Sequence, residues 1–424
     1  MIGKSTIEPM ERKEYLNATE AAALLGVRKQ TLYAYVSRGL VRSLNDNSAR
    51  RTRLYLREDL DRIKLKAGAR LGHEAVAATA MNLGAPIVPS SITEISADGP
   101  LYRNQLAVDL VRQGASFEQT AELLWTGLLH EAPFGWSTVQ VLNRPHRLLR
   151  TLPSDVAHEQ FLEVLALVAQ YLAMGRGLLP DRLRSGRTLE AAREVIVTMA
   201  GCFGLLSTRA RYVPIPTRLT VAEGILHAMG VSADRESVRL LNAVLVLMAD
   251  HELSPGTLAA RVAASAGASL HSCLSAALSA SAGTEVARLY DRADRFLYEA
   301  SSASALLACA EELLAKGMPV PGFDHPVYPK GDPRARCILD LVRQRAGLPR
   351  EVRKIISFVD QLAARRGIYA RHGIGLIAAC RVIGLPPQSP AAIFVMARTA
   401  GWVAHIQEQR LSKSLLRPRA KFVG

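Results

Sequence analysis

From Ser90 to the end of the chain, apolar residues recur every three or four positions, which is the spacing of amphipathic helices. The composition agrees, because 49% of the residues are apolar but only 5% are aromatic, an Ala/Leu-rich balance that favours helices packed on helices. At 424 residues the chain is long enough for two or three domains and a sizeable core. We therefore expect an all-α fold, with helices at 107–111, 121–128, 156–175, 187–206, 219–229 and 235–249.

The N-terminal part predicts two short helices joined by a tight turn. Asn17 is placed to cap the first helix, and Glu20, three residues later, completes a capping box. Gly26 ends this helix, and a second follows over 29–38 with Gly39 as its C-terminal stop. Leu32 and Val36 are expected to face inward, and a basic, hairpin-like segment over 48–63 then runs into another helix.

This pattern resembles the winged helix-turn-helix of the MerR and excisionase type over about residues 14–65, so we assign residues 1–65 to such a domain. The resemblance implies that the second helix enters a major groove and that the wing contacts phosphates. The implied DNA-binding residues are Arg28, Lys29, Gln30, Tyr33, Arg50, Arg51 and Arg53. The alternative is a module for protein contacts, with its basic residues on a solvated face.

Charge favours an anionic partner. The chain carries a net charge of +15, and residues 1–70 hold 15 Lys/Arg against 8 Asp/Glu. Residues 410–424 add five basic residues and no acid. Double-stranded DNA is therefore an expected partner.

The five cysteines lie far apart, without the spacing of a zinc site or a disulfide frame. The N-terminus lacks the apolar core of a signal peptide, and the apolar runs near Val244 and Phe394 are interrupted by Asp250 and Arg398. We expect a cytoplasmic protein with reduced thiols, no metal and no membrane partner.

The segment VPGFDHPVYPKGDPRA, at 320–335, holds four prolines and two glycines, which is too many for a helix interior. His325 is a group that titrates near neutral pH, and Arg334 is a two-pronged partner for a carboxylate. A proton donor beside an anion clamp suits a small keto acid. The alternative is a surface loop with a chance histidine and arginine.

Other segments of the sequence carry motifs that belong with this loop. ADHELSPGTLAARVAAS, VPGFDHPVYPKGDPRA, FVMARTAGWVAHIQEQ and LLRPRA follow one another in the order and approximate spacing of the citrate synthase family, after SSITEISADGPLYRN and SFEQTAELLWTG. The resemblance covers residues 85–424. It implies a large and a small helical domain, with the small subdomain at about 284–386, and leaves 66–84 as a helix end and linker.

The family resemblance also implies a site. His325 would hydrogen-bond the ketone and protonate the alkoxide, and the substrate-binding set would be His251, Arg334, Arg398 and, from a partner subunit, Arg417. A coenzyme A thioester would meet Pro321, Gly322 and Phe323. No permanently bound cofactor is expected; acetyl-CoA or propionyl-CoA and a dicarboxylate such as oxaloacetate or citrate are the implied ligands.

Two catalytic groups of the family are missing. Where a G-P-x-H-G-G motif would stand, Gly283-Thr284 is followed by Glu285, and Gly373 takes the position of the general base aspartate. His372 is adjacent and Asp360 lies thirteen residues before Gly373, but a one-residue shift at a helix start should direct His372 away from the target.

The sequence therefore predicts a homodimer that binds a dicarboxylate or acyl-CoA ligand without efficient condensation. It would act as a DNA-binding regulator that responds to this ligand. One alternative is a citrate or 2-methylcitrate synthase with a rearranged base. Another is a non-catalytic subunit of a genuine synthase.

Overall fold

The computed structural model describes residues 15–37, 41, 43–45, 53–57, 60, 88–131, 135–136, 144–153, 155, 159–174, 187–283, 287–412 and 414–417. The chain divides into two compact units, one of Met1–Pro89 with Arg417–Gly424 and the other of Ser90–Leu416. Each unit has its own hydrophobic core.

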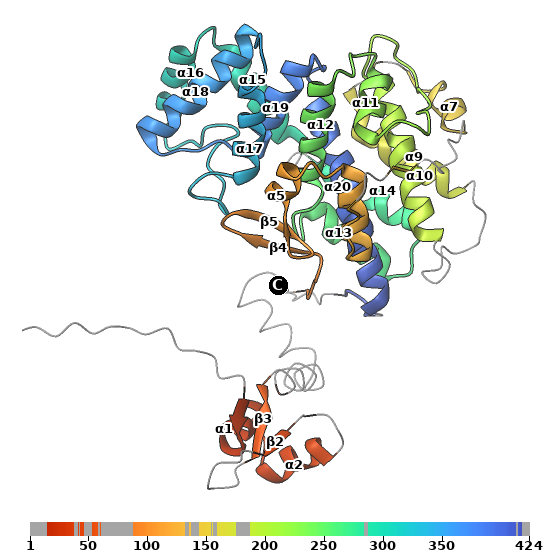
Figure 1. Cartoon of the computed structure of the whole chain (residues 1–424), viewed down its shortest axis with the longest axis vertical. Helices are drawn as coiled ribbons and strands as arrows, with labels where there is room; N and C mark the ends of the chain where they lie inside the picture. The colour runs from red at the N-terminus through yellow and green to blue at the C-terminus, as the bar shows by residue number, and fades with distance from the viewer. Residues whose placement is uncertain are drawn as a thin grey trace, which may run out of the picture. The chain divides into compact units, whose positions relative to one another are not determined.

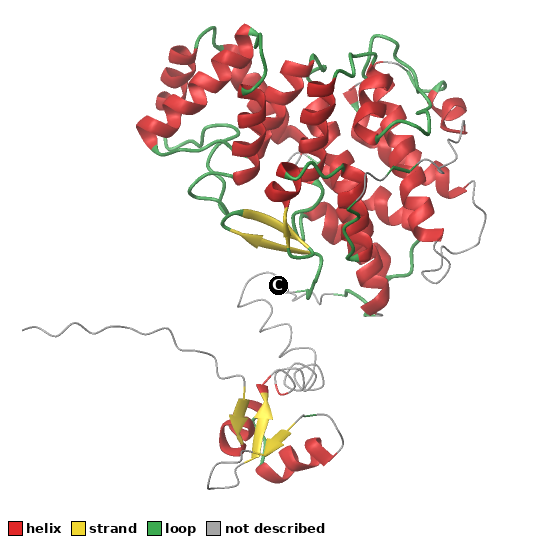
Figure 2. Cartoon of the chain, in the orientation of Figure 1, coloured by secondary structure: helices red, strands yellow, loops and turns green. Residues whose placement is uncertain are grey.

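In its described residues, the smaller unit combines helices α1 and α2 with a three-stranded antiparallel sheet (Figures 1 and 2). The strand order is β1-β3-β2, and the elements are α1 (Ala18–Leu25), α2 (Lys29–Ser37), β1 (Tyr15–Asn17), β2 (Ser43–Asn45) and β3 (Arg53–Leu56). The predicted capping box is confirmed, because the Asn17 side chain accepts from the Thr19 and Glu20 amides while Glu20 accepts from the Asn17 amide. Gly26 ends α1 in the left-handed conformation that glycine adopts without strain.

The two faces of α2 differ as predicted. Leu32 is fully buried and Val36 packs against the same core. On the other side Arg28, Lys29 and Gln30 are exposed, and Tyr33 is 47% exposed. Strands β2 and β3 pair antiparallel, with Arg53 exposed at the start of β3. Only β3 falls within the hairpin-like segment predicted over 48–63, because β2 lies before it. The predicted stop at Gly39, the wing residues Arg50 and Arg51, and the linker at 66–84 lie outside the described residues.

Among the residues that the structure describes, the larger unit is helical apart from one small sheet (Figure 2), which confirms the all-α expectation for its bulk. The sheet order is β4-β5-β6, all antiparallel. Its elements are β4 (Thr93–Ser96), β5 (Gly99–Tyr102), β6 (Gln105–Leu106), α5 (Ala107–Arg112), α6 (Phe117–Thr126), α7 (Arg144–Leu149), α9 (Phe161–Met174), α10 (Arg187–Cys202), η2 (Phe203–Leu205), α11 (Val221–Met229), α12 (Arg235–Met248), α13 (Pro255–Ser265), α14 (Leu270–Ser281), α15 (Ala287–Glu299), α16 (Ala303–Ala315), α17 (Pro333–Arg343), α18 (Arg350–Arg366), α19 (His372–Ile383) and α20 (Ser389–Ser412).

Helix α20 organises the interior. It is buried along most of its length and packs against α6, α10, α12, α13, α14 and α19. At Gly401 a Cβ atom would collide with the Ala249 carbonyl, so glycine permits the close approach of α20 to the end of α12. This approach brings the Arg398 turn of α20 toward residues 249–251.

Helices α15 to α19 gather on one side of this unit (Figure 1), where α16 packs on α18 and both α15 and α17 pack on α19. The proline-rich loop leads from α16 into α17. Asp332 caps α17, its carboxylate accepting from the Arg334 amide, and Pro333 occupies the first helical position.

In the described part of the chain, no helix combines the length and the apolarity that a bilayer span requires. Of the five cysteines, all free thiols, Cys202, Cys273 and Cys380 are buried.

Candidate functional site

The histidines and arginines predicted from the sequence meet where three segments converge. His251 lies between α12 and α13, His325 in the loop before α17, and His372 at the start of α19. The ring centroids of His251 and His325 are 6.0 Å apart, and those of His325 and His372 are 6.4 Å apart. Arg334 and Arg398 are both close enough to lower the pKa of His251 by their charge.

His251 is a neutral hydrogen-bonding group. Burial, first, and then the charges of Arg334 and Arg398 hold its pKa far below the usual range. Its Nε2 lies 3.0 Å from the hydroxyl oxygen of Tyr328, which is itself buried. The Arg334 guanidinium lies 5.4 Å from the centre of the Tyr328 ring. Tyr328 was not singled out from the sequence, although it stands in the same loop, three residues after His325.

His325 has a defined tautomer. Its Nδ1 accepts the Val327 amide at 3.1 Å, so in the neutral ring the proton resides on Nε2. Burial, and then the charge of Arg334, lower the pKa of His325 to about 4, and the ring is therefore neutral at pH 7. A neutral imidazole whose Nε2–H faces a carbonyl oxygen can donate a hydrogen bond to it.

Arg334 already has a carboxylate partner. Its Nε and Nη2 donate to the two oxygens of Asp332 at 3.0 and 2.9 Å, and the two side chains are 1% and 0% exposed. Burial alone would raise the pKa of Asp332, but the Arg334 charge and a hydrogen bond from His372 hold it well below its usual range. The fork predicted to clamp a ligand is thus directed at Asp332, which leaves Nη1 for a ligand.

Arg398 has no such partner. It is 2% exposed, and in the described part of the chain its Nε and Nη1 make no hydrogen bond. The guanidinium lies 4.9 Å from the centre of the Phe394 ring. Burial lowers the pKa of Arg398, and the Asp250 carboxylate opposes this. Buried donors without acceptors are costly, so an anion is the natural complement of this side chain.

His372 corrects an expectation. It was predicted to point away from the site, yet its Nδ1 lies 3.2 Å from Arg334 Nη2 and 3.3 Å from an Asp332 oxygen. The shift fails to remove it because His372 is the first residue of α19, where the Asp332 carboxylate also accepts its backbone amide. Its Nε2 lies 3.1 Å from the hydroxyl oxygen of Tyr290, so both ring nitrogens are engaged within the chain.

The other candidates for the missing groups lie elsewhere. Asp360 is on α18, 59% exposed and 2.6 Å from Arg343. Gly373 faces the Tyr290 ring, 3.5 Å from where its Cβ would stand. Glu285 lies outside the described residues. Arg417 is exposed beyond the end of α20, and its assignment to a partner's site stays a prediction.

The segment proposed to contact coenzyme A is largely engaged in contacts within the protein. Phe323 is buried against Phe358, with ring centroids 5.3 Å apart. The carbonyls of Gly322 and Phe323 accept from the backbone and side chain of Arg371 at 2.9 and 2.8 Å. The backbone of Pro321, Gly322 and Phe323 thus has few groups left over, and its coenzyme role stays a prediction.

A metal ion does not fit this cluster. Donor atoms of His325, Asp332 and His372 lie within 4.8 Å of one another, as in some metal sites. However, both Asp332 oxygens are bound to Arg334, and a cation would sit against that guanidinium. These donors are therefore committed to Arg334 and do not offer a free carboxylate to a metal ion.

A hydrogen-bonded network of buried polar side chains supports the site. The sequence pattern did not predict it. His405 Nδ1 lies 3.2 Å from Arg261, so its Nε2–H donates to Asp250 at 3.1 Å. Arg261 in turn pairs with Glu408 at 2.6 Å. The Tyr102 hydroxyl donates to the Leu247 carbonyl at 3.0 Å. These contacts fix the chain turn that carries His251.

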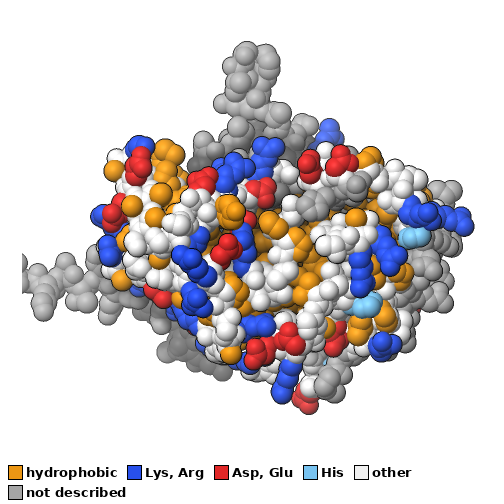
Figure 3. All heavy atoms as spheres, turned by 90° about the horizontal axis from the view of Figure 1, so that it is seen from above, with side chains coloured by type: hydrophobic (Ala, Val, Ile, Leu, Met, Phe, Trp, Pro, Cys, Tyr) orange, Lys and Arg blue, Asp and Glu red, His pale blue; other side chains and the backbone are white. Residues whose placement is uncertain are grey.

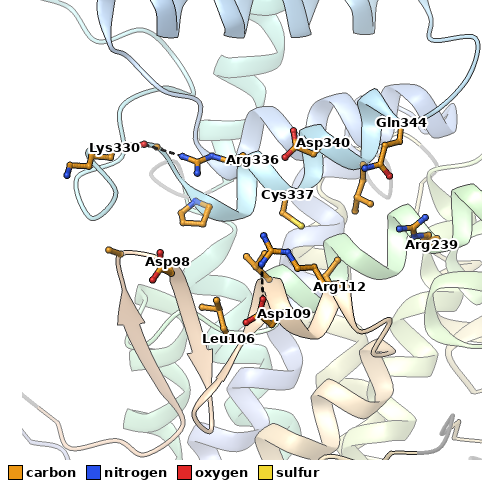
Figure 4. A pocket seen from close by; sticks show the side chains of 16 residues that line it. Asp98, Leu106, Asp109, Arg112, Arg239, Lys330, Arg336, Cys337, Asp340 and Gln344 are labelled. Atoms are coloured by element: carbon orange, nitrogen blue, oxygen red, sulfur yellow. Dashed lines mark hydrogen bonds and ion pairs between the residues drawn. The ribbon is translucent and has the colours of Figure 1, made fainter.

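A cavity of about 690 Å³ lies between α5 and α17 (Figure 4). Its lining mixes the basic Arg112, Arg239, Lys330 and Arg336 with the acidic Asp98, Asp109 and Asp340. Arg112 and Asp109 pair with each other at 2.8 Å. The lining of this cavity therefore has no single sign of charge.

Residues 82–419 match the family model described as citrate synthase, C-terminal domain, and residues 15–66 match a helix-turn-helix domain. A Mycobacterium tuberculosis protein of the citrate synthase type is 32% identical over 238 residues, 53% of this chain and 64% of that protein, so the match spans less than two thirds of its length. Citrate synthase 2 of Bacillus subtilis is 25% identical over 364 residues, 83% of this chain and 95% of that protein.

Among solved structures, citrate synthase of Thermoplasma acidophilum in ternary complex with carboxymethyl coenzyme A and oxaloacetate superposes with a TM-score of 0.71. The match covers 81% of this chain and 96% of that one at 22% identity, and so supports the fold. The motif order, the helical architecture and these matches agree. The chain belongs to the citrate synthase family and carries an N-terminal helix-turn-helix domain of the MerR and excisionase type.

Proposed function

We propose that this protein binds a small dicarboxylate or acyl-CoA ligand without condensing it efficiently, and that occupancy regulates DNA binding by the helix-turn-helix domain. One observation carries the proposal. Arg398 is buried with two donors that no described residue bonds, in a cluster where the neutral His325 offers Nε2–H, while the groups that could remove a proton are already engaged.

Condensation needs a base near the acyl methyl group. Both nitrogens of His372 are used by Arg334, Asp332 and Tyr290. The pKa of Asp332 lies far below its usual range because of Arg334, so its carboxylate is a weak base. A positioned general base is typically worth roughly 10²–10⁴-fold in rate. The cluster therefore favours holding an anion over making an enolate.

The DNA half of the proposal rests on α2. Its exposed face presents Arg28, Lys29, Gln30 and Tyr33, and the surrounding segment has the excess of positive charge noted above. We further propose a cytoplasmic homodimer that presents two such helices to a palindromic site, with Arg417 completing the partner's pocket. Ligand-dependent closure of the helical unit would supply the two states that a regulator needs.

Release of free coenzyme A tests the catalytic part. Acetyl-CoA or propionyl-CoA with oxaloacetate should give turnover far below ordinary enzyme rates. Calorimetry with oxaloacetate, citrate or coenzyme A should show binding, and Arg398→Met should weaken the binding of oxaloacetate or citrate. Ordinary turnover that is lost in His325→Ala would overturn the proposal. DNA binding, measured with and without the bound ligand, should differ; equal affinities would contradict the regulatory part.

A second candidate is a citrate or 2-methylcitrate synthase with a rearranged base. The position of His372 beside His325 favours it, since rotation about the side chain would free one ring nitrogen. His372→Gln separates the two proposals: a large loss of turnover with ligand affinity unchanged supports the enzyme, and no measurable turnover in either protein supports the regulator.

A further inference from the structure

The citrate-synthase-like unit carries a second basic feature, remote in sequence from the site. Residues 140–151 and 203–219 contain six arginines and no aspartate or glutamate. The two segments meet at a cavity of about 410 Å³, which is lined by His146, Arg147, Arg211, Tyr212, Val213 and Pro214. We name the exposed residues Arg147, Arg150, Arg209, Arg211 and Arg218 the arginine face.

The arginine face is uncompensated. Some exposed basic side chains of this unit pair with acids, as Arg112 does with Asp109 and Lys316 with Glu312. Within the part of the chain that the structure describes, none of the five side chains of the arginine face forms an ion pair. Figure 3 shows basic and histidine side chains gathered toward the edge where Figure 1 places α7 and α11. A surface of one sign attracts a partner of the opposite sign.

The backbone that carries Arg211 is held firmly. The amides of Arg211 and Val213 donate to the carbonyls of Gly204 and Gly201, each at 3.1 Å. A Cβ at Gly201 would stand 2.5 Å from the Val213 carbonyl, and one at Gly204 would collide with the Arg211 carbonyl. Only glycine allows the segment to lie this close, so the arginines are presented from a fixed support.

The chemistry of the lining favours phosphate groups. Guanidinium groups bind phosphate through two parallel hydrogen bonds, and two segments that each carry several arginines suit a polymer better than one small anion. Because the same chain carries a helix-turn-helix domain, a phosphodiester backbone is already a candidate ligand of this protein.

We infer that the arginine face binds the phosphate backbone of duplex DNA, adding non-specific affinity to the recognition by α2. This inference rests on the proposed DNA binding. It makes the citrate-synthase-like unit a direct contributor to the complex, in addition to its role as ligand sensor.

Salt dependence of DNA binding by the full chain tests the inference. Fluorescence anisotropy with a duplex of about 40 base pairs gives the slope of log affinity against log salt. Each phosphate contact contributes about 0.9 to that slope, so the triple variant R147Q/R211Q/R218Q should lower its magnitude by about 2 to 3.

The control variant R112Q/K316Q/R366Q also removes three positive charges, but at exposed side chains that are already paired with acids. It should leave the slope close to that of the unmodified protein. An arginine-face variant that behaves like this control overturns the inference. A larger loss on an RNA hairpin than on duplex DNA overturns the choice of DNA.

A third variant, R28Q/K29Q, separates this inference from the proposed function. Loss of binding in the α2 variant without loss in the arginine-face variant overturns only the inference. The opposite pattern overturns only the helix-turn-helix proposal, and an unmodified protein that binds no DNA overturns both.

Discussion

Two buried arginines in the candidate site play different parts. Arg334 is bound on its forked side by Asp332, so its charge is balanced whether or not a ligand is present. Arg398 keeps two donors that no described residue bonds, so a ligand is needed to satisfy them. Ligand affinity should therefore depend most on Arg398.

Replacing Arg398 by methionine should weaken oxaloacetate binding about 10²-fold, since a hydrogen bond to a charged group contributes roughly 1.5–3 kcal/mol. Isothermal calorimetry measures the change. Arg343→Met, at a side chain on α17 that pairs with Asp340 and Asp360, is the control and should bind as the unmodified protein does. Equal affinities for the two variants would show that the anion binds elsewhere.

The histidines of the site predict a pH dependence of stability. The pKa values of His325 and His372 are lowered to about 4, chiefly by burial, whereas in the unfolded chain they lie near 6.5. The unfolded state therefore takes up protons first, and stability should be complete above about pH 6.5 and fall as pH drops toward about 4.

Thermal unfolding between about pH 7 and pH 4.5 measures this loss. His372→Gln keeps hydrogen-bonding groups but cannot titrate in this window, so its melting temperature should depend less steeply on pH. An identical slope in both proteins would assign the titration to other groups.

At this scale the sequence singled out residues that the structure brings together, but it did not predict their hydrogen bonds and ion pairs. His251, His325, Arg334 and Arg398 were found because their motifs occur in a recognisable order. Spacing along the chain carries no information on which neighbour occupies a side chain. The pairing of Arg334 with Asp332 was therefore missed, and so was the contact that places His372 beside Asp332, whose carboxylate accepts the His372 backbone amide.

Helices were the predictable elements and strands were not. The patterns at 187–206, 219–229 and 235–249 became α10, α11 and α12, because an amphipathic stripe repeats within one segment. Strands β1, β4, β5 and β6 have between two and four residues, and their pairing depends on partners outside the segment. Such short strands leave too few alternating positions to read.

The segment after η2 offers a test of element packing. Gly204→Ala places a Cβ against the Arg211 carbonyl and should cost about 1–3 kcal/mol of stability, as overpacking does. Gly135→Ala is the matched control, because nothing lies within 4 Å of its added Cβ. Chemical denaturation of both variants measures the difference; equal stability would mean that the segment moves freely.

The molecule as a whole consists of two units with separate cores, and a shared unfolding transition is not required. We expect two transitions in scanning calorimetry. Asn17→Ala, which removes the cap of α1, should cost about 1 kcal/mol and lower only the transition of the smaller unit. Asn17→Asp retains a cap and should restore it, and a single transition shifted as one would contradict the independence of the units.

The ion pair between Asp332 and Arg334 has a consequence for the concentrations to which the protein can respond. Because the cation has a resident partner, an incoming acid competes with it and gains less than it would from a bare guanidinium. We expect weak, rapidly reversible binding. Such a protein would respond to changes in the concentration of an abundant metabolite and not to a metabolite present at trace concentration.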